Sequence, residues 1–214
     1  TLLANSALHL QCSTQTDTNH IRATRLIDWW VGNNVLFIDP AGQYAIPSQI
    51  NSSQDALWQQ LLKLLKRYRQ AHAINSVLIV IDFPSLWRGE SAQYEKLTHG
   101  LARQIQLIKD IADDMPISIV ISQCDRIPGF REFFTHLSQE ERDQCFGFAL
   151  HPDMTYEANY QQFVAHISQQ LIWRLHHEQN LSTRCRIKDL PIQLEQLKVP
   201  LLYLLSQLPL TDQS

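Results

Sequence analysis

The sequence predicts an α/β fold, a three-layer sandwich with a mostly parallel sheet, followed by a small helical extension. Two observations predict it. Short apolar runs of strand length alternate with longer segments of helical periodicity through residue 150. Beyond that residue only helical periodicity remains. We therefore expect an α/β domain over residues 1–150 and a helical extension over residues 151–214.

Buried strands are expected where Val, Leu and Ile run together between turn residues. The first strand follows a Gly-Asn-Asn turn and ends on an aspartate. The expected strands cover residues 35–39, 76–82, 117–122 and 146–150.

Helices are expected where leucine and isoleucine recur every three or four residues. Asp55 is placed to cap one of them, and Pro200 is expected to kink or split the last. The expected helices cover residues 1–10, 56–70, 97–108, 131–137, 139–145, 156–178 and 191–208.

Composition excludes several classes of protein. The formal net charge of -3 over 214 residues argues against a nucleic-acid-binding surface. No apolar run is long enough to span a bilayer. The four cysteines are scattered, without a C-x-x-C pair, so neither a disulfide framework nor a zinc site is expected.

The first candidate site lies at the end of the first expected strand, where open α/β sheets bind ligands. Asp39 and Gly42 form a D-x-x-G pattern, in which the aspartate holds magnesium through water and the glycine N–H approaches a phosphate. Thr24, in the preceding loop, is placed to reach the same magnesium ion. The alternative is a simple strand-ending turn.

The second candidate site follows the strand at residues 117–122. Ser122 and Asp125 occupy the outer positions of a tetrad that, in GTPases, reads [N/T]-K-x-D and holds the guanine base. Gln123 replaces the lysine, which removes its charge and its long aliphatic stem. The alternative is an aspartate that caps the next turn.

The order of these elements is that of the GTPase branch of P-loop proteins, so the fold is expected to be P-loop GTPase-like. The phosphate-binding loop G-x-x-x-x-G-K-[ST] is missing from the chain, and we expect it to lie upstream of Thr1. The expected cofactor is GTP or ATP with magnesium, or none at all. Gln43, directly after Gly42, is the candidate to orient an attacking water, and a solvent-facing glutamine is the simpler interpretation.

The sequence resembles the IcmF/TssM family over nearly its whole length. The most specific matches are the D-W-W stretch that follows Thr24 and the D-x-A-G-x-Y stretch that begins at Asp39. Weaker matches extend the resemblance on both sides. They are Thr1–Leu8, the helix around Trp58 and Arg69, residues 73–77, residues 123–130, Phe133-Phe134, Glu141-Arg142, Gly147, Arg174-Leu175, Glu178 and Arg184.

The resemblance implies a protein of the bacterial inner membrane, with this domain facing the cytoplasm and the membrane helices outside this segment. It implies a DotU/TssL/IcmH-like inner-membrane partner and other secretion-complex subunits. Pro40 and Gln123 depart from the family pattern at the nucleotide site. These departures put hydrolysis in doubt and favour the type IVB (Dot/Icm) branch over type VI.

Three interpretations of function remain open. The first is a scaffold that supports assembly and stability of a secretion apparatus and has lost nucleotide turnover. The second is an active GTP- or ATP-binding NTPase that regulates the complex. The third is a general interaction module that docks through residues 156–208.

Overall fold

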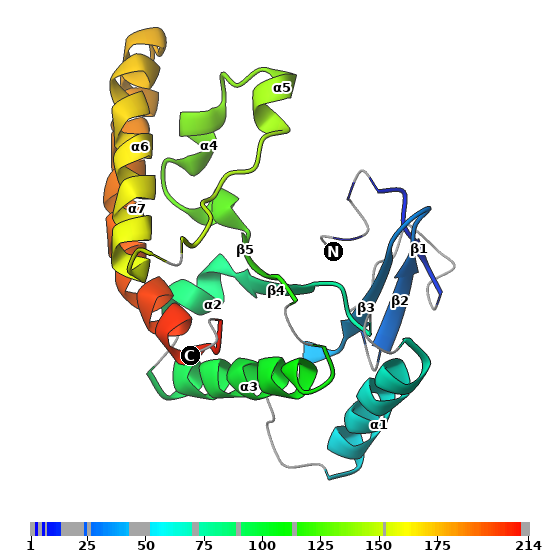
Figure 1. Ribbon diagram of the computed structural model, residues 1–214. Helices are drawn as coiled ribbons and strands as arrows, with labels where there is room; N and C mark the ends of the chain where they lie inside the picture. Colours follow the sequence, from blue (N-terminus) through cyan, green and yellow to red (C-terminus); the bar gives the residue numbers. More distant parts are fainter. Residues whose placement is uncertain are drawn as a thin grey trace. The chain divides into compact units, whose positions relative to one another are not determined.

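The computed structural model describes residues 3, 6, 8–13, 24, 27–42, 52–69, 73–88, 91–112, 115–151 and 153–210 (Figure 1). The chain divides into two compact units. The first unit comprises Thr1–Val77 and Glu95–Pro116, and the second comprises Leu78–Tyr94 and Ile117–Ser214. The boundary at residue 150 expected from the sequence stays a prediction. Half of the helix expected over residues 1–10 lies outside the described residues, and the described residues 8–10 are not helical.

The first unit contains a three-stranded antiparallel sheet. Its strands are β1 (Gln11–Cys12), β2 (Ile27–Val31) and β3 (Leu36–Pro40), in the order β1-β2-β3. The Gly32 N–H donates to the Val35 carbonyl oxygen at 2.8 Å, which closes a two-residue turn at Asn33 and Asn34. This tight turn fixes the register of the hairpin.

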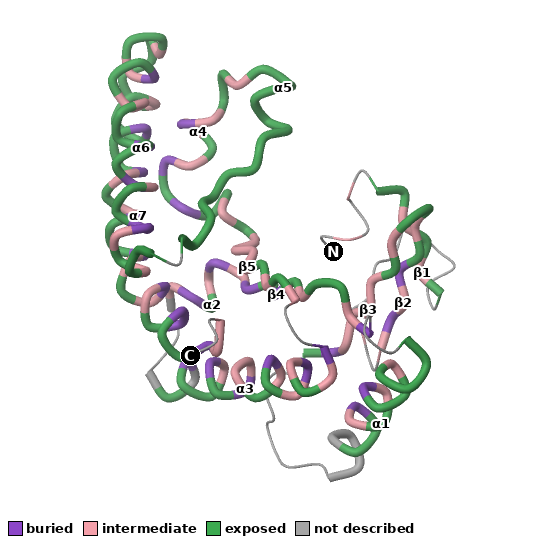
Figure 2. The backbone as a smooth tube through the Cα atoms, viewed as in Figure 1, coloured by how far each residue is buried: buried purple, intermediate pink, exposed green. Residues whose placement is uncertain are grey.

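Two helices provide the apolar core of the first unit. They are α1 (Ser52–Arg69) and α3 (Ser91–Lys109), whose first turn belongs to the second unit. Trp58 and Leu62, one turn apart on α1, are buried with Ile108. Lys66 Nζ donates to the Asp110 carbonyl oxygen at 2.7 Å and so ties the ends of the two helices together. Figure 2 shows buried residues recurring along α1 and α3 between exposed ones.

The second unit contains a two-stranded parallel sheet, β4 (Val77–Asp82) and β5 (Ile117–Ser122). Asp82 at the end of β4 accepts a hydrogen bond from the Ser85 N–H at 2.9 Å and so caps the next helix. The remaining elements are helical: α2 (Phe83–Arg88), η3 (Cys124–Arg126), α4 (Phe130–Phe134), α5 (Gln139–Arg142), α6 (Tyr156–His177) and α7 (Leu181–Gln207).

The α6–α7 hairpin carries most of the buried apolar surface of the second unit. Thr155 and Asn180 cap the two helices by accepting hydrogen bonds from N–H groups of the first turns. The Tyr160 hydroxyl donates to the Leu194 carbonyl oxygen at 2.6 Å inside the contact. The buried face of α7 consists of Ile187, Leu190, Leu194, Leu197, Leu201, Leu204 and Leu205. No described helix combines the length and the apolar character needed to cross a membrane.

The expected P-loop GTPase-like sandwich with a mostly parallel sheet is wrong. The described strands form one antiparallel sheet of three strands and one parallel pair. A two-residue turn permits only antiparallel pairing between β2 and β3. The parallel pair β4 and β5 is joined through α2 and α3, a connection long enough for the crossover that parallel pairing requires.

Smaller differences concern the ends of elements. Residues 146–150 form no strand; Phe146 and Phe148 instead pack their rings on the Phe163 ring of α6. Helix α1 begins at Ser52, before the expected cap at Asp55. Helix α7 begins at Leu181 and continues through Pro191 and Pro200 without a break. Its leucine face is buried on both sides of each proline, and this packing outweighs the lost backbone hydrogen bonds.

Gly129 marks the closest approach between α4 and α7. It has a φ of 85° and precedes the first turn of α4. A Cβ built at this position would overlap the carbonyl oxygen of Arg186 and lie 3.1 Å from the backbone nitrogen of Leu190. Both the backbone conformation and the space therefore require glycine.

We expect Gly129→Ala to destabilise the second unit. The left-handed backbone costs about 1 kcal/mol and the overlap with rigid helix backbone a further ~1–3 kcal/mol. The melting temperature should fall by roughly 5 °C or more. Gly147→Ala is the matched control, because the nearest atom to its Cβ is the Cys145 sulfur at 4.0 Å. Equal melting temperatures for the two variants would contradict this account.

Candidate functional site

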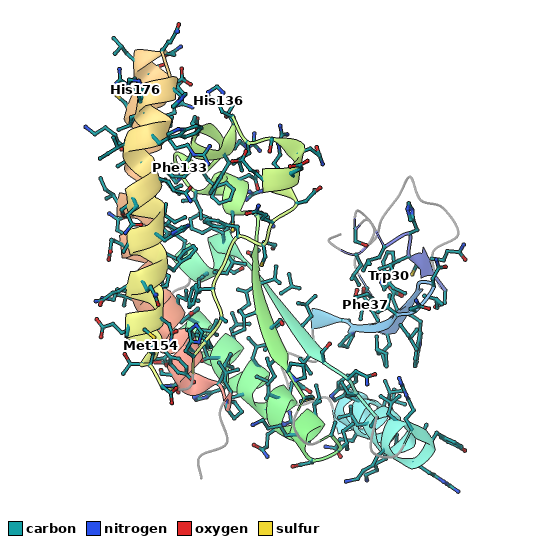
Figure 3. The ribbon with its side chains drawn as sticks, turned by 45° about the horizontal axis from the view of Figure 1, so that its top comes forward. Trp30, Phe37, Phe133, His136, Met154 and His176 are labelled. Carbon is teal, nitrogen blue, oxygen red and sulfur yellow. The ribbon has the colours of Figure 1, made fainter. Side chains whose placement is uncertain are left out.

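The β2–β3 hairpin places two aspartates opposite each other. Asp28 pairs with Asp39 in the antiparallel register, and Trp30 pairs with Phe37 beside them. Directly opposed residues point to the same side of a sheet, so these four side chains share one face. Figure 3 labels Trp30 and Phe37 on this sheet. Asp28 is buried, and Asp39 is partly buried.

Thr24 connects the two carboxylates. Its Oγ1 lies 2.9 Å from Asp28 Oδ2 and 3.0 Å from Asp39 Oδ2. A hydroxyl has one proton and donates it to one acceptor at a time. The second close contact is met by sharing of that proton between the two acceptors, by a proton on one of the carboxyls or by a cation between them. We call Thr24, Asp28 and Asp39 the oxygen cluster.

The surroundings of the oxygen cluster favour the protonated form of Asp39. Burial is the largest influence and raises the pKa of this carboxyl, and the negative charge of Asp28 raises it further. The hydrogen bond from Thr24 opposes both effects by lowering the pKa. The Trp30 indole also lowers it, although its buried Nε1 makes no hydrogen bond of good geometry.

A hard cation suits the ligand types of the oxygen cluster. Magnesium prefers carboxylate and hydroxyl oxygens and retains several waters or phosphate oxygens. Across the described ranges, no three His, Cys, Asp or Glu side chains gather as a metal site. Among the described residues the oxygen cluster therefore offers two carboxylates and a hydroxyl, an incomplete shell that further oxygen ligands would have to fill.

The other residues expected around Asp39 are placed only in part. Gly42 is exposed, and a Cβ added to it would meet no described atom within 4 Å. Gln43, the candidate to orient a water, lies outside the described residues.

The second candidate site belongs to the second unit. Ser122 Oγ lies 3.5 Å from the Ile81 carbonyl oxygen, and Gln123 has a left-handed backbone with φ 59°. The Asp125 carboxylate accepts a hydrogen bond from Arg131 Nη2 at 2.6 Å. This guanidinium holds the pKa of Asp125 below its usual value. Both side chains are largely exposed, so the ion pair contributes little to stability.

The structure thus brings Thr24 and Asp39 together within the first unit, whereas Ser122 and Asp125 lie in the second unit. Reasoning from sequence gave no role in the site to Asp28 or Trp30. A signal was present: Asp28 and Asp39 are equally far from the centre of the Asn33-Asn34 turn. A two-residue turn at that point makes them direct neighbours.

We expect Asp39→Asn to raise the melting temperature at neutral pH. A carboxyl whose folded pKa is raised stabilises the fold below its unfolded pKa of about 4 and loses that contribution as pH rises through the folded pKa. The gain from the uncharged amide should therefore shrink as pH falls from 7 toward about 4. Thermal melts across this pH range measure it.

Asp125→Asn is the control, for which we expect the opposite dependence of stability on pH. Its carboxyl has a lowered pKa, so the native charge helps at neutral pH and the help fades on acidification. A loss of stability in Asp39→Asn that is largest at pH 7 would overturn the assignment of a raised pKa.

Comparison with known proteins gives two matches. The family model described as the IcmF-related N-terminal domain matches residues 51–213. The type VI secretion system component TssM1 of Pseudomonas aeruginosa is 28% identical over 211 residues, covering 92% of this chain and 19% of its own length. The chain therefore spans about a fifth of this curated relative. No solved structure matches the chain. Because the family match covers well over half of the residues, the chain belongs to the IcmF-related family.

Proposed function

We propose that this chain is a structural part of a bacterial secretion apparatus, and that it supports assembly and stability of the complex without turning over a nucleotide. The observation that carries the proposal is the family match over residues 51–213. The similarity to TssM1, which is named as a component of a type VI secretion system, supports it.

The proposal includes a location and a partner. The parent protein sits in the bacterial inner membrane, with this segment facing the cytoplasm and the membrane helices elsewhere in its chain. Its partner is a DotU/TssL/IcmH-like inner-membrane protein. The type IVB preference drawn from Pro40 and Gln123 stays a prediction. The name of the relative makes type VI the first system to test.

Electrostatics favours the scaffold over the enzyme. Magnesium binding requires charged carboxylates, whereas burial and Asp28 disfavour the charged form of Asp39. Guanine recognition requires a free Asp125 carboxylate, and that oxygen is engaged by Arg131. A bound nucleotide with magnesium would have to stabilise the charged form of Asp39 and displace Arg131 from Asp125.

An NTPase is the second candidate, and one observation favours it. Thr24 and Asp39, fifteen residues apart in sequence, are held 3.0 Å apart as a magnesium site would require. In that case Thr24 and Asp39 would hold the magnesium ion of a bound nucleotide.

For the secretion role, we expect the tagged full-length protein, extracted from its own bacterium, to co-purify with a DotU/TssL/IcmH-like protein. Quantitative mass spectrometry against an untagged strain measures the enrichment. Deleting the gene should also stop secretion by the corresponding apparatus. Recovery of other membrane proteins only, together with unchanged secretion in the deletion strain, would refute the proposed role.

For the nucleotide, we expect no binding heat when GTP or ATP with magnesium is titrated into the full-length protein. The limit is about 1 mM, which corresponds to roughly -4 kcal/mol of binding free energy. Heat below about 100 µM that disappears in Asp39→Asn and in Asp125→Ala would favour the NTPase. The exposed Asp143→Ala serves as the control that should leave any such heat unchanged.

A further inference from the structure

Helix α7 carries a second apolar face, opposite to the buried leucines. Positions spaced alternately by four and three residues lie on one side of a helix. We call the set with this spacing the outer stripe. It consists of Leu181, Cys185, Lys188, Ile192, Glu195 and Val199.

The apolar members of the outer stripe are strongly exposed. The exposed fractions are 74% for Leu181, 56% for Ile192 and 75% for Val199. Helix α6 of the same hairpin differs over its middle turns, where the exposed side carries Gln161, Gln162, His166 and Gln169, while its exposed apolar residues Ile172 and Trp173 lie toward its C-terminal end. A helix that is apolar on both sides is typical of burial on both sides. The outer stripe is therefore suited to contact with another surface.

Two charges flank the centre of the outer stripe. Lys188 precedes Ile192 by four residues and Glu195 follows it by three, so both lie on the same edge of the stripe. Both side chains are exposed, and neither makes a hydrogen bond or an ion pair within the described chain. On the other edge of the stripe, Asp189 precedes Ile192 by three residues and the neutral Gln196 follows it by four.

This charge pattern is complementary to itself. When two identical helices pack antiparallel, the same edge of each helix faces that edge of the other. A two-fold axis at Ile192 then sets Lys188 against Glu195 of the partner subunit, twice, and Asp189 against Gln196 of the partner subunit. No like charges oppose each other. A two-fold contact of this kind is the commonest way in which identical subunits associate.

We propose that the outer stripe of α7 is the interface of an antiparallel homodimer of this chain, with Ile192 at the two-fold axis. From Leu181 to Val199 the stripe extends roughly 27 Å along the helix. Paired Lys188 and Glu195 set the direction and register of the contact, while Leu181, Ile192 and Val199 supply the apolar area. The proposal does not depend on the secretion role.

Sedimentation of the purified chain over a concentration series tests the proposal. A reversible dimer is expected at low salt. Ile192→Glu should weaken it at least tenfold. Lys188→Glu alone, and Glu195→Lys alone, should each weaken it several-fold, because each creates two like-charge pairs. The double variant Lys188→Glu with Glu195→Lys should restore the affinity of the native chain.

The matched control is Ile172→Glu on α6. This residue is 79% exposed, and it should leave the dimer unchanged. Circular dichroism confirms that each variant is folded. A monomer at all concentrations, equal effects of Ile172→Glu and Ile192→Glu, or a double charge variant without recovery would each overturn the proposal.

A disulfide tests the register independently. Residues 185 and 199 lie equally far from Ile192, so the antiparallel dimer brings Cys185 near position 199 of the partner subunit. In a Cys145→Ser background, Val199→Cys should form a covalent dimer on mild oxidation, with the 185–199 linkage found by peptide mass. A 185–185 linkage in the chain without Val199→Cys would indicate parallel packing and contradict the proposed interface.

Discussion

The buried face of α7 is the contact on which the second unit depends. Helices α2, α4 and α6 all pack on α7. Two tyrosine hydroxyls reinforce it, one donating from Tyr160 to the Leu194 carbonyl and one from Tyr94 to the Pro200 carbonyl at 2.5 Å. Gly129 lets the start of α4 reach the backbone of α7. An α7 anchored at so many points remains one helix in spite of two internal prolines.

The hairpin register plays the equivalent role in the first unit. It opposes Asp28 to Asp39 on a partly buried face, which by itself is an unfavourable arrangement of like charges. The hydrogen bond from Thr24 lowers the pKa of Asp39. Burial and the charge of Asp28 raise it by more, so the pKa remains above its usual value. Opposed carboxyls on a partly buried face are a departure from local stability rules that is typical of functional sites.

Local pattern predicted many of the individual elements, since hydrophobic period is a property of each segment, but it missed β1, β2 and α2. Strand β5 has the expected bounds and α6 ends one residue before its expected end, whereas α3 begins at Ser91, six residues before its expected start. The pairing of strands into sheets could not be predicted from the hydrophobic pattern of single segments. The order of motifs suggested one sheet where the structure has two. The contact between Thr24 and Asp39 was expected from motif spacing, but Asp28 required the register of the hairpin.

Proton binding and cation binding compete for the same oxygens in the oxygen cluster. Burial and Asp28 both disfavour the charged form of the Asp39 carboxyl and so raise its pKa. A divalent cation would reverse this preference by supplying the opposite charge, and it would release that proton on binding. The affinity for magnesium must therefore overcome the raised pKa as well as the incomplete ligand shell. A cation bound there would need further oxygen ligands beyond Thr24, Asp28 and Asp39, from water, from a phosphate group or from residues outside the described ranges.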